Sequence, residues 1–181
     1  MIQKIGTLGN AGGPLLVDRI VTNSLAVAVG YAMRTTAGFA ALATTGSRVL
    51  GHVESLVGAD GLSPVKDGTY LGNIGEVFTA TADNQTVAKV RVRMDVDTRS
   101  IYSAELDAAF GTTTGSGLAG KYFSLADKDT LDESTLGEVI AVLTEGTPNT
   151  IAYKQYYSHG VDASTPANAV VNIVHSEVFG A

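Results

Sequence analysis

Alternation of apolar and polar or small residues over short segments is the feature of this sequence that most limits how it can fold. In the segment Ser24 to Arg34, large apolar side chains occupy the odd positions from Leu25 to Met33, and Ala or Gly occupies the even positions between them. A period of two is typical of a β-strand, whose successive side chains point to opposite faces. We therefore predict a strand over residues 24–34 whose small face lies close to other backbone.

Short apolar runs continue along the chain and are separated by turn signals such as Asp60-Gly61 and Asp67-Gly68. Long stretches with a helical period of 3.6 are absent from the sequence. This pattern predicts an all-β fold, a β-sandwich or a β-barrel, with few short helices. The best helix candidate is residues 132–143, where Asp132 or Ser134 could cap, although the β-branched residues there favour a strand.

The length of 181 residues is enough for one domain to bury a core without disulfides or metals. Near the N-terminus, glycines at positions 6, 9, 12 and 13 and Pro14 interrupt any helix. We expect residues 1–23 to form an extended N-terminal arm and residues 24–181 to form a single β-rich domain. Such an arm would be either loose or laid across a neighbouring molecule.

The run Val87 to Asp107, VAKVRVRMDVDTRSIYSAELD, has two amphipathic halves close together in sequence. They predict an antiparallel hairpin that turns around Thr98 to Ser100. If the apolar faces coincide, one register sets Arg93 opposite Glu105 and another sets Arg91 opposite Glu105. Both registers pair opposite charges, so the pattern does not choose between them.

The same run contains a candidate cation site. Asp95 and Asp97 begin like a calcium loop, but Arg99 and Ser100 stand where an EF-hand needs an oxygen ligand and a glycine. An irregular cation site at Asp95 and Asp97 is left open. The four basic residues of the run are accompanied by four carboxylates, and the whole chain carries a net charge of −6, so we expect no nucleic-acid partner.

Residue types that could carry metal or thiol chemistry are few. The sequence has no cysteine, which excludes thiolate metal sites and disulfides. His52, His159 and His175 are scattered without ligand spacing, and a strand position on the surface or half-buried is the simplest interpretation of His175. No G-x-S-x-G motif supports a catalytic triad.

Glycine-rich and acidic segments give no stronger evidence for catalysis. The loop Gly111 to Gly120 lacks the lysine and the strand-to-helix context of a phosphate-binding loop. A carboxylate pair for glycoside hydrolysis has no support from a tryptophan platform. We therefore expect no enzymatic activity and no catalytic, cofactor-binding or metal-ligating residues. The carboxylates considered are Glu138, Glu145, Asp127, Asp129, Asp132 and Glu133.

The low content of charged residues indicates what kind of partner the chain can bind. Charged residues make up only 17% of the chain, below the roughly 25% of an average soluble domain, so much of the surface is uncharged and suited to cover by a partner. No signal peptide is visible, and no window approaches about 18 consecutive apolar residues, so we expect no membrane partner.

Residues Gly75 to Leu143 carry a resemblance to a known group. The stretch GEVFTATADNQTVAKVRVRMDV, followed by YSAELDAAFGTTTGSGLAGKYFSLADKDTLDESTL, resembles small structural proteins of tailed-phage heads. The shared pattern is a strand ending near D-x-D, a Y-x-A-x-L-D strand, a G-T-T loop, a K-Y-F strand and an acidic D-x-x-T-x-D segment. The resemblance implies a capsid decoration (cement) protein or another accessory virion protein, β-rich and homo-oligomeric, with a trimer favoured. It implies no catalytic residues and no cofactor.

We therefore expect a virion structural protein that binds the lattice of the major capsid protein on the capsid surface, and that is present in the host cytoplasm during assembly. The net charge of −6 suits the outside of a capsid better than its DNA-lined interior. The arm residues expected at contacts are Ile5, Leu15, Leu16 and Val17. The alternatives are another virion subunit, such as a major capsid or tail component, and a carbohydrate-binding or enzymatic module of the virion surface.

Overall fold

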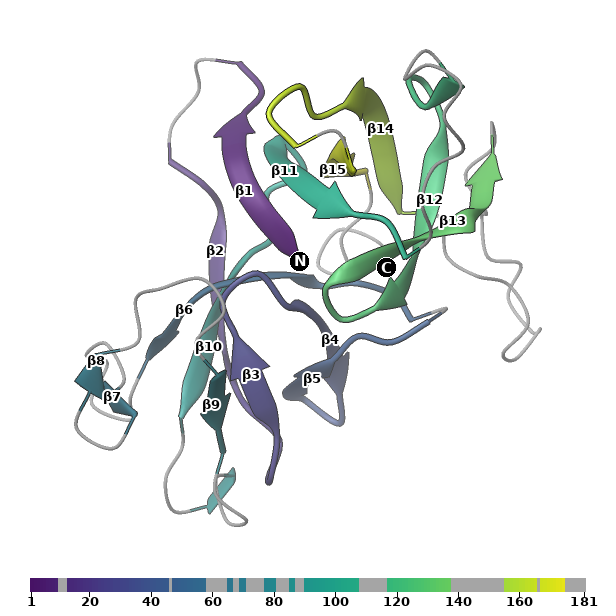
Figure 1. Ribbon diagram of the computed structural model, residues 1–181. Coiled ribbons are helices and arrows are strands. Elements are labelled where there is room, and N and C mark those ends of the chain that lie inside the picture. The colour runs from purple at the N-terminus through teal and green to yellow at the C-terminus, as the bar shows by residue number, and fades with distance from the viewer. Residues whose placement is uncertain are drawn as a thin grey trace.

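The structure is a computed structural model, and its strands form two main antiparallel sheets. In Figure 1 the six-stranded sheet lies above the five-stranded sheet, in an arrangement consistent with a β-sandwich. The prediction of an all-β fold is confirmed, and the described strands do not close into a barrel. The structure describes residues 1–9, 13–45, 47–57, 65–66, 69–70, 77–80, 85–86, 90–107, 117–137, 155–165 and 167–174.

The strands of each sheet come from distant parts of the chain. In order across the six-stranded sheet they are β1 (Ile2–Thr7), β11 (Ser100–Glu105), β15 (Asn168–Ile173), β14 (Tyr156–Val161), β12 (Tyr122–Asp127) and β13 (Thr130–Gly137). The five-stranded sheet runs β2 (Leu16–Ile20), β10 (Arg91–Asp95), β6 (Gly51–Val57), β4 (Ala32–Thr36) and β5 (Phe39–Leu42). Two small ribbons pair β3 (Ala26–Ala28) with β9 (Val77–Thr79), and β7 (Val65–Lys66) with β8 (Thr69–Tyr70).

Each sheet has its own cluster of buried apolar side chains. The first cluster is centred on Tyr102, Phe123 and Tyr156 of the six-stranded sheet. The second is centred on Met33 and Met94 of the five-stranded sheet. Burial of these side chains is the main force that holds the strands in place.

The predicted strand over residues 24–34 is interrupted at Gly30, which separates β3 from β4. Gly30 has φ of +89°, and a Cβ there would overlap the carbonyl oxygen of Ile2. The expectation that the small face lies close to other backbone is therefore confirmed at this position. The continuous strand is wrong because a left-handed backbone conformation ends regular pairing.

The helix considered for residues 132–143 is wrong over its described part. Residues 132–137 belong to β13, which forms a hairpin with β12. Pairing with β12 gives these residues a neighbouring strand, and tertiary context of this kind overrides a weak local helix signal. Residues 138–143 lie outside the described residues.

The hairpin predicted between residues 87 and 107 is also wrong. Its first half is β10, which pairs with β2 and β6, and its second half is β11, which pairs with β1 and β15. The chain passes from one sheet to the other between Asp95 and Ser100 instead of folding back. The alternation was interpreted correctly as strand, but a period of two says nothing about which strand is the partner.

The actual partner of both halves is the N-terminal segment 1–23, which is the segment assigned to an arm. Along β1, Ile2 faces Ala104 and Thr7 faces Ser100; along β2, Leu16 faces Asp95. Residues 2–7 therefore run antiparallel to residues 100–104 in one sheet, and residues 16–20 run antiparallel to residues 91–95 in the other. Figure 1 shows β1 and β2 along the same side of the molecule.

The predicted ion pairs between Glu105 and Arg91 or Arg93 do not form, and Arg93 and Glu105 pair with residues of the N-terminal segment instead. Arg93 forms a bidentate ion pair with Asp18 on β2, with both N···O distances 2.9 Å. Glu105 accepts from the N-terminal ammonium of Met1 at 2.7 Å. Neither of the two predicted registers forms, because these partners lie on the N-terminal strands.

We predict that Gly30→Ala lowers the free energy of unfolding by more than about 2 kcal/mol, because the new methyl group adds an overlap with Ile2 to the cost of a positive φ. Urea unfolding of the two proteins measures the difference. Gly38→Ala is the matched control, since Gly38 has φ of +86° but open space around it, and it should cost only about 1–2 kcal/mol. Equal effects at the two glycines would contradict the close packing of Ile2 on Gly30.

Candidate functional site

The passage between the two sheets is built by two aspartates. Asp95 accepts a hydrogen bond from the backbone N–H of Asp97, and Asp97 accepts one from the backbone N–H of Arg99, each at 2.9 Å. A carboxylate that binds the N–H two residues further on is an Asx turn. The D-x-D motif therefore bends the chain at the place where β10 leaves one sheet and β11 enters the other.

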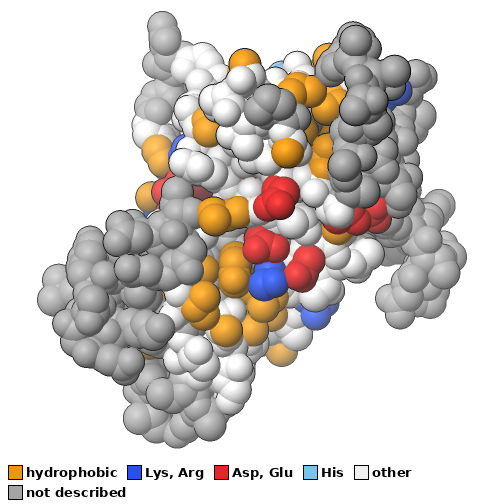
Figure 2. All heavy atoms as spheres, in the orientation of Figure 1, with side chains coloured by type: hydrophobic (Ala, Val, Ile, Leu, Met, Phe, Trp, Pro, Cys, Tyr) orange, Lys and Arg blue, Asp and Glu red, His pale blue; other side chains and the backbone are white. Residues whose placement is uncertain are grey.

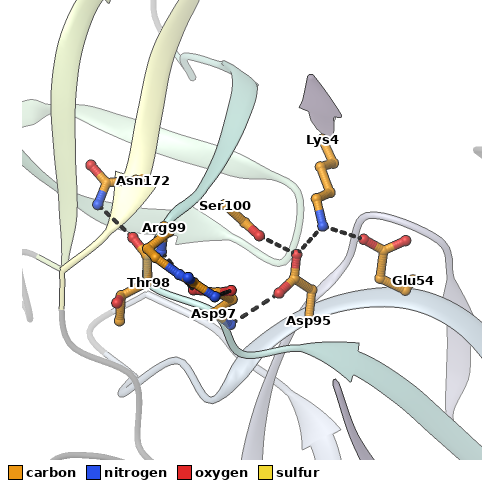
Figure 3. Close-up of polar contacts among 8 residues, drawn as sticks. All are labelled: Lys4, Glu54, Asp95, Asp97, Thr98, Arg99, Ser100 and Asn172. Carbon is orange, nitrogen blue, oxygen red and sulfur yellow. Dashed lines mark hydrogen bonds and ion pairs between the residues drawn. The ribbon is translucent and has the colours of Figure 1, made fainter. Parts of the chain in front are cut away.

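Asp95 is also the centre of an ion-pair cluster that joins β1, β6 and β10 (Figure 3). The Lys4 ammonium lies 2.6 Å from Oδ2 of Asp95 and 3.2 Å from Oε1 of Glu54. The Ser100 hydroxyl donates to the same Oδ2 of Asp95 at 2.5 Å. The Asp95 side chain is completely buried, whereas those of Lys4 and Glu54 are 24% and 34% exposed, so the cluster is open to solvent on one side.

The pKa of Lys4 reflects this setting. Burial acts to lower the pKa, but the hydrogen bonds and negative charges of Asp95 and Glu54 outweigh it, and the net pKa lies above the usual value. Lys4 is therefore an ammonium ion at neutral pH. The cluster is a buried ion pair with a second carboxylate at its edge.

A cleft of about 240 Å³ lies beside the cluster, lined by β1, the turn at Gly30, β6 and β11. The Tyr102 hydroxyl is among its walls and has no hydrogen-bond partner among the described residues. Burial, and then the charge of Asp95, raises the pKa of Tyr102 far above its usual value. The cleft therefore combines a cation, the carboxylate of Glu54 and a neutral phenol. Its lining residues are Ile2, Gln3, Lys4, Val29, Gly30, His52, Val53, Glu54 and Tyr102.

His52 also lines the cleft and links the two sheets. Its Nδ1 lies 3.1 Å from the carbonyl oxygen of Gly30, and its Nε2 lies 3.1 Å from the hydroxyl of Tyr156 on β14. In a neutral ring, Nδ1–H donates to Gly30 and Nε2 accepts from Tyr156. Burial lowers the pKa of His52 to about 4, so the ring is neutral at physiological pH.

The cation site left open at Asp95 and Asp97 is faced by protein cations. Lys4 binds Asp95, and the Arg99 guanidinium binds Asp97 at 2.6 Å. The pKa of Asp97 is about 2, although burial acts to raise it. Hydrogen bonding to Arg99 is the largest cause of that low pKa. Among the described residues, no group of three or more His, Cys, Asp or Glu side chains is arranged to hold a metal ion.

The other candidate residues that the structure describes do not come together into a site. His159 is exposed and lies 2.9 Å from Asn172, and His175 is outside the described residues. Asp127 and Asp129 flank Lys128 in the turn between β12 and β13, at 2.8 and 3.9 Å. The carboxylates of Glu138 and Glu145, the side chain of Glu133, and residues 111–116 of the glycine loop also lie outside the described part of the chain.

Sequence reasoning did not identify Lys4, Glu54, His52 and Tyr102 as one group. One signal was present, because Lys4 stands two residues after the buried Ile2 on a short strand and therefore points to the same face. A lysine on an inward face needs an anion as partner. That partner, Asp95, lies 91 residues away in the sequence, and no local pattern reveals a pairing at this separation.

Large apolar side chains are exposed at the N-terminal edge of both sheets. Among the described residues, all those with substantial exposure lie within the first 16 positions, and Val17 packs on the second core cluster. The backbones of Leu8 and Leu15 bind Arg99 and Val96, so they approach the passage between the sheets from its two ends. The exposed residues are Met1 (41%), Ile5 (50%), Leu8 (41%), Leu15 (44%) and Leu16 (41%), named here the N-terminal apolar edge.

A further apolar area lies on the face shown in Figure 2. Hydrophobic side chains gather there over β3 and β5, next to acidic and basic side chains over the turn between β12 and β13. At this boundary the Lys128 ammonium lies 5.3 Å from the ring centre of Tyr31, a cation–π contact. The larger side chains here, Leu25, Tyr31 and Leu42, are partly buried, whereas those of the N-terminal apolar edge are exposed.

We predict that the protein loses stability as the pH falls from about 6.5 to about 4, since His52 must take up a proton that its buried site disfavours. The unfolded chain binds this proton with a pKa near 6.5, so the native state is stabilised above that pH. The expected loss between about pH 7 and about pH 4.5 is about 2–3 kcal/mol from this residue.

Urea unfolding at several pH values measures this dependence, and His52→Gln is the comparison. The variant should be less stable at neutral pH, because it loses the contacts of the ring, but its stability should change less over the same range. A pH profile with the same slope in both proteins would show that His52 is not responsible. Asp97 contributes below this window, because its stabilising effect is lost as the pH falls from its usual pKa of 3.8 to its folded value of about 2.

Comparisons with known proteins do not assign the chain to a family. No helix among the described residues is both long and apolar enough to cross a membrane. No protein-family model, no curated protein and no solved structure matches this chain.

Proposed function

We propose that this chain is a structural protein of a tailed-phage head, a decoration (cement) protein that binds the lattice of the major capsid protein from outside. The observation that carries the proposal is the N-terminal apolar edge, where Met1, Ile5, Leu8, Leu15 and Leu16 are exposed on or beside two edge strands. Single exposed apolar residues are normal, but a group confined to one segment indicates a surface that a partner covers.

The resemblance of residues 75–143 to small phage head proteins supports the same proposal. The low content of charged residues, 17%, also fits a protein with extensive contacts, and the net charge of −6 suits the outer surface of a shell. A contact of about 800 Å² per partner, repeated over a lattice, would stabilise each position of the shell. Self-association, with a trimer favoured, belongs to the same proposal.

No described feature favours the enzymatic alternative. Glycoside hydrolysis needs two facing carboxylates with an open space between them for the substrate. Glu54 lines the cleft and the buried Asp95 lies beside it, and these two carboxylates share one lysine instead. The proposal is therefore a binding role with no reaction on an external substrate.

The test is size-exclusion chromatography with light scattering, with and without empty heads of the phage that encodes the chain. We predict that the wild-type protein co-migrates with heads. Leu15→Ser combined with Leu16→Ser should weaken binding by about tenfold or more, because burying each leucine contributes about 1.5–3 kcal/mol.

Ala119→Ser is the control, since Ala119 is an exposed apolar residue outside the N-terminal segment, and binding should be unchanged. Circular dichroism checks that all variants are folded. Failure of the wild-type protein to bind heads at micromolar concentration would refute the proposal. Normal binding by the double leucine variant would show that the contact lies elsewhere on the molecule.

A further inference from the structure

We propose that Lys4 and Asp95 form an intramolecular isopeptide bond, in a self-catalysed condensation assisted by Glu54. The three side chains come from β1, β10 and β6, which meet at the junction of the two sheets (Figure 3). The structure shows them as the ion pair from which such a bond would form. This inference is independent of the proposed function.

The contact between the reacting groups is short and shielded. The Lys4 Nζ lies 2.6 Å from Oδ2 of Asp95, and the carboxyl carbon that it would attack is one bond further on. Reacting atoms in near-attack geometry are about 3–3.5 Å apart. Because the Asp95 side chain is completely buried, bulk water does not reach its carboxyl carbon, and Lys4 has no competing nucleophile there.

The Asp95 carboxyl group is held in one orientation. Its Oδ1 accepts from the backbone N–H of Asp97 at 2.9 Å, and its Oδ2 accepts from Ser100 and Lys4. When the amine adds to the carbon, negative charge develops on an oxygen, and the fixed Asp97 N–H is placed to stabilise it, as in an oxyanion hole. The Asx turn that bends the chain therefore also orients the group for reaction.

Glu54 distinguishes this cluster from a simple ion pair. Its Oε1 lies 3.2 Å from the Lys4 Nζ and is partly exposed, so it can accept a proton from the amine and pass it on. The exposed pair Lys128–Asp127 has a similar N···O distance of 2.8 Å, but its aspartate is 54% exposed to water. The cleft of about 240 Å³ next to Lys4 and Glu54 offers a route for the released water.

The reaction balances without another reagent. The Lys4 ammonium first transfers a proton to Asp95, which gives a neutral amine and a neutral carboxylic acid. The amine nitrogen bonds to the carboxyl carbon, and Glu54 accepts a second proton from nitrogen and delivers it to Oδ2. The carbon–oxygen bond then breaks, one water leaves, and an amide remains between Nζ and the carboxyl carbon.

Two physical effects favour the amide. Groups held in contact react with effective molarities of about 10⁵–10⁸ M, which opposes hydrolysis of the bond by water. The product is also neutral, so it removes the desolvation cost of a buried charge pair. Because the pKa of Lys4 is raised, the neutral amine is a minor species, and we expect the bond to form slowly after folding.

Mass spectrometry of the full-length denatured protein tests the inference. We expect the mass of the wild-type chain to fall, during incubation of the folded protein, by the mass of one water. Trypsin digestion should then yield a branched peptide that joins residues 1–19 to residues 94–99, because an acylated Lys4 is no longer cleaved. A succinimide also loses one water but gives no branched peptide, so the digest separates the two.

Three variants complete the experiment. Lys4→Arg keeps the positive charge but cannot form this amide, and it should retain the full mass. Glu54→Gln should fold and form the bond at least tenfold more slowly, and Lys128→Arg should react like the wild-type chain. A wild-type protein that is folded by circular dichroism and keeps its full mass after prolonged incubation refutes the inference, and so does a water loss that persists in Lys4→Arg without the branched peptide.

Discussion

The two sheets depend on one arrangement, the antiparallel pairing of the N-terminal strands β1 and β2 with β11 and β10. Both parts of the chain pass from one sheet to the other at the same place, and the passage is stabilised where Lys4 meets Asp95. Asp95 is a completely buried charge, which is tolerable only because an ammonium, a hydroxyl and a backbone N–H all donate to it. Removing one partner of such a pair typically costs about 3–5 kcal/mol, because the remaining charge stays buried.

The same junction places polar chemistry between two apolar clusters. His52 connects the turn at Gly30 to Tyr156 of the other sheet, and its ring centre lies 4.6 Å from that of Tyr102 with the planes tilted by 49°. Because the ring is neutral, its Nδ1–H donates to Gly30 and its Nε2 accepts from Tyr156. A buried polar group without a hydrogen-bond partner costs stability, so a network of this kind forms only in one arrangement of the two sheets. It therefore specifies how the sheets pack more narrowly than apolar contacts alone would.

The N-terminal segment also has a second role in the proposed function. Its inward residues, Ile2 and Lys4, hold the fold together, while its outward residues form the N-terminal apolar edge. A bond or ion pair at Lys4 would therefore hold the strand that presents the proposed contact surface. Anchoring an interface segment before binding lowers the entropy that binding must overcome. The proposed isopeptide bond and the proposed lattice contact are compatible for this reason, although neither requires the other.

The amino-acid sequence by itself determined the all-β class, the presence of strands within residues 24–34 and 91–105, and the turn around Thr98 to Ser100. These properties depend on local alternation and on side chains that bind the backbone two residues away, which neighbouring residues decide. Only the tertiary structure decided that β10 and β11 pair with β2 and β1 instead of each other, and that Lys4 is the partner of Asp95. The physical reason is that a strand with one apolar face is satisfied by any partner of matching register, and the choice among partners depends on packing of the whole chain.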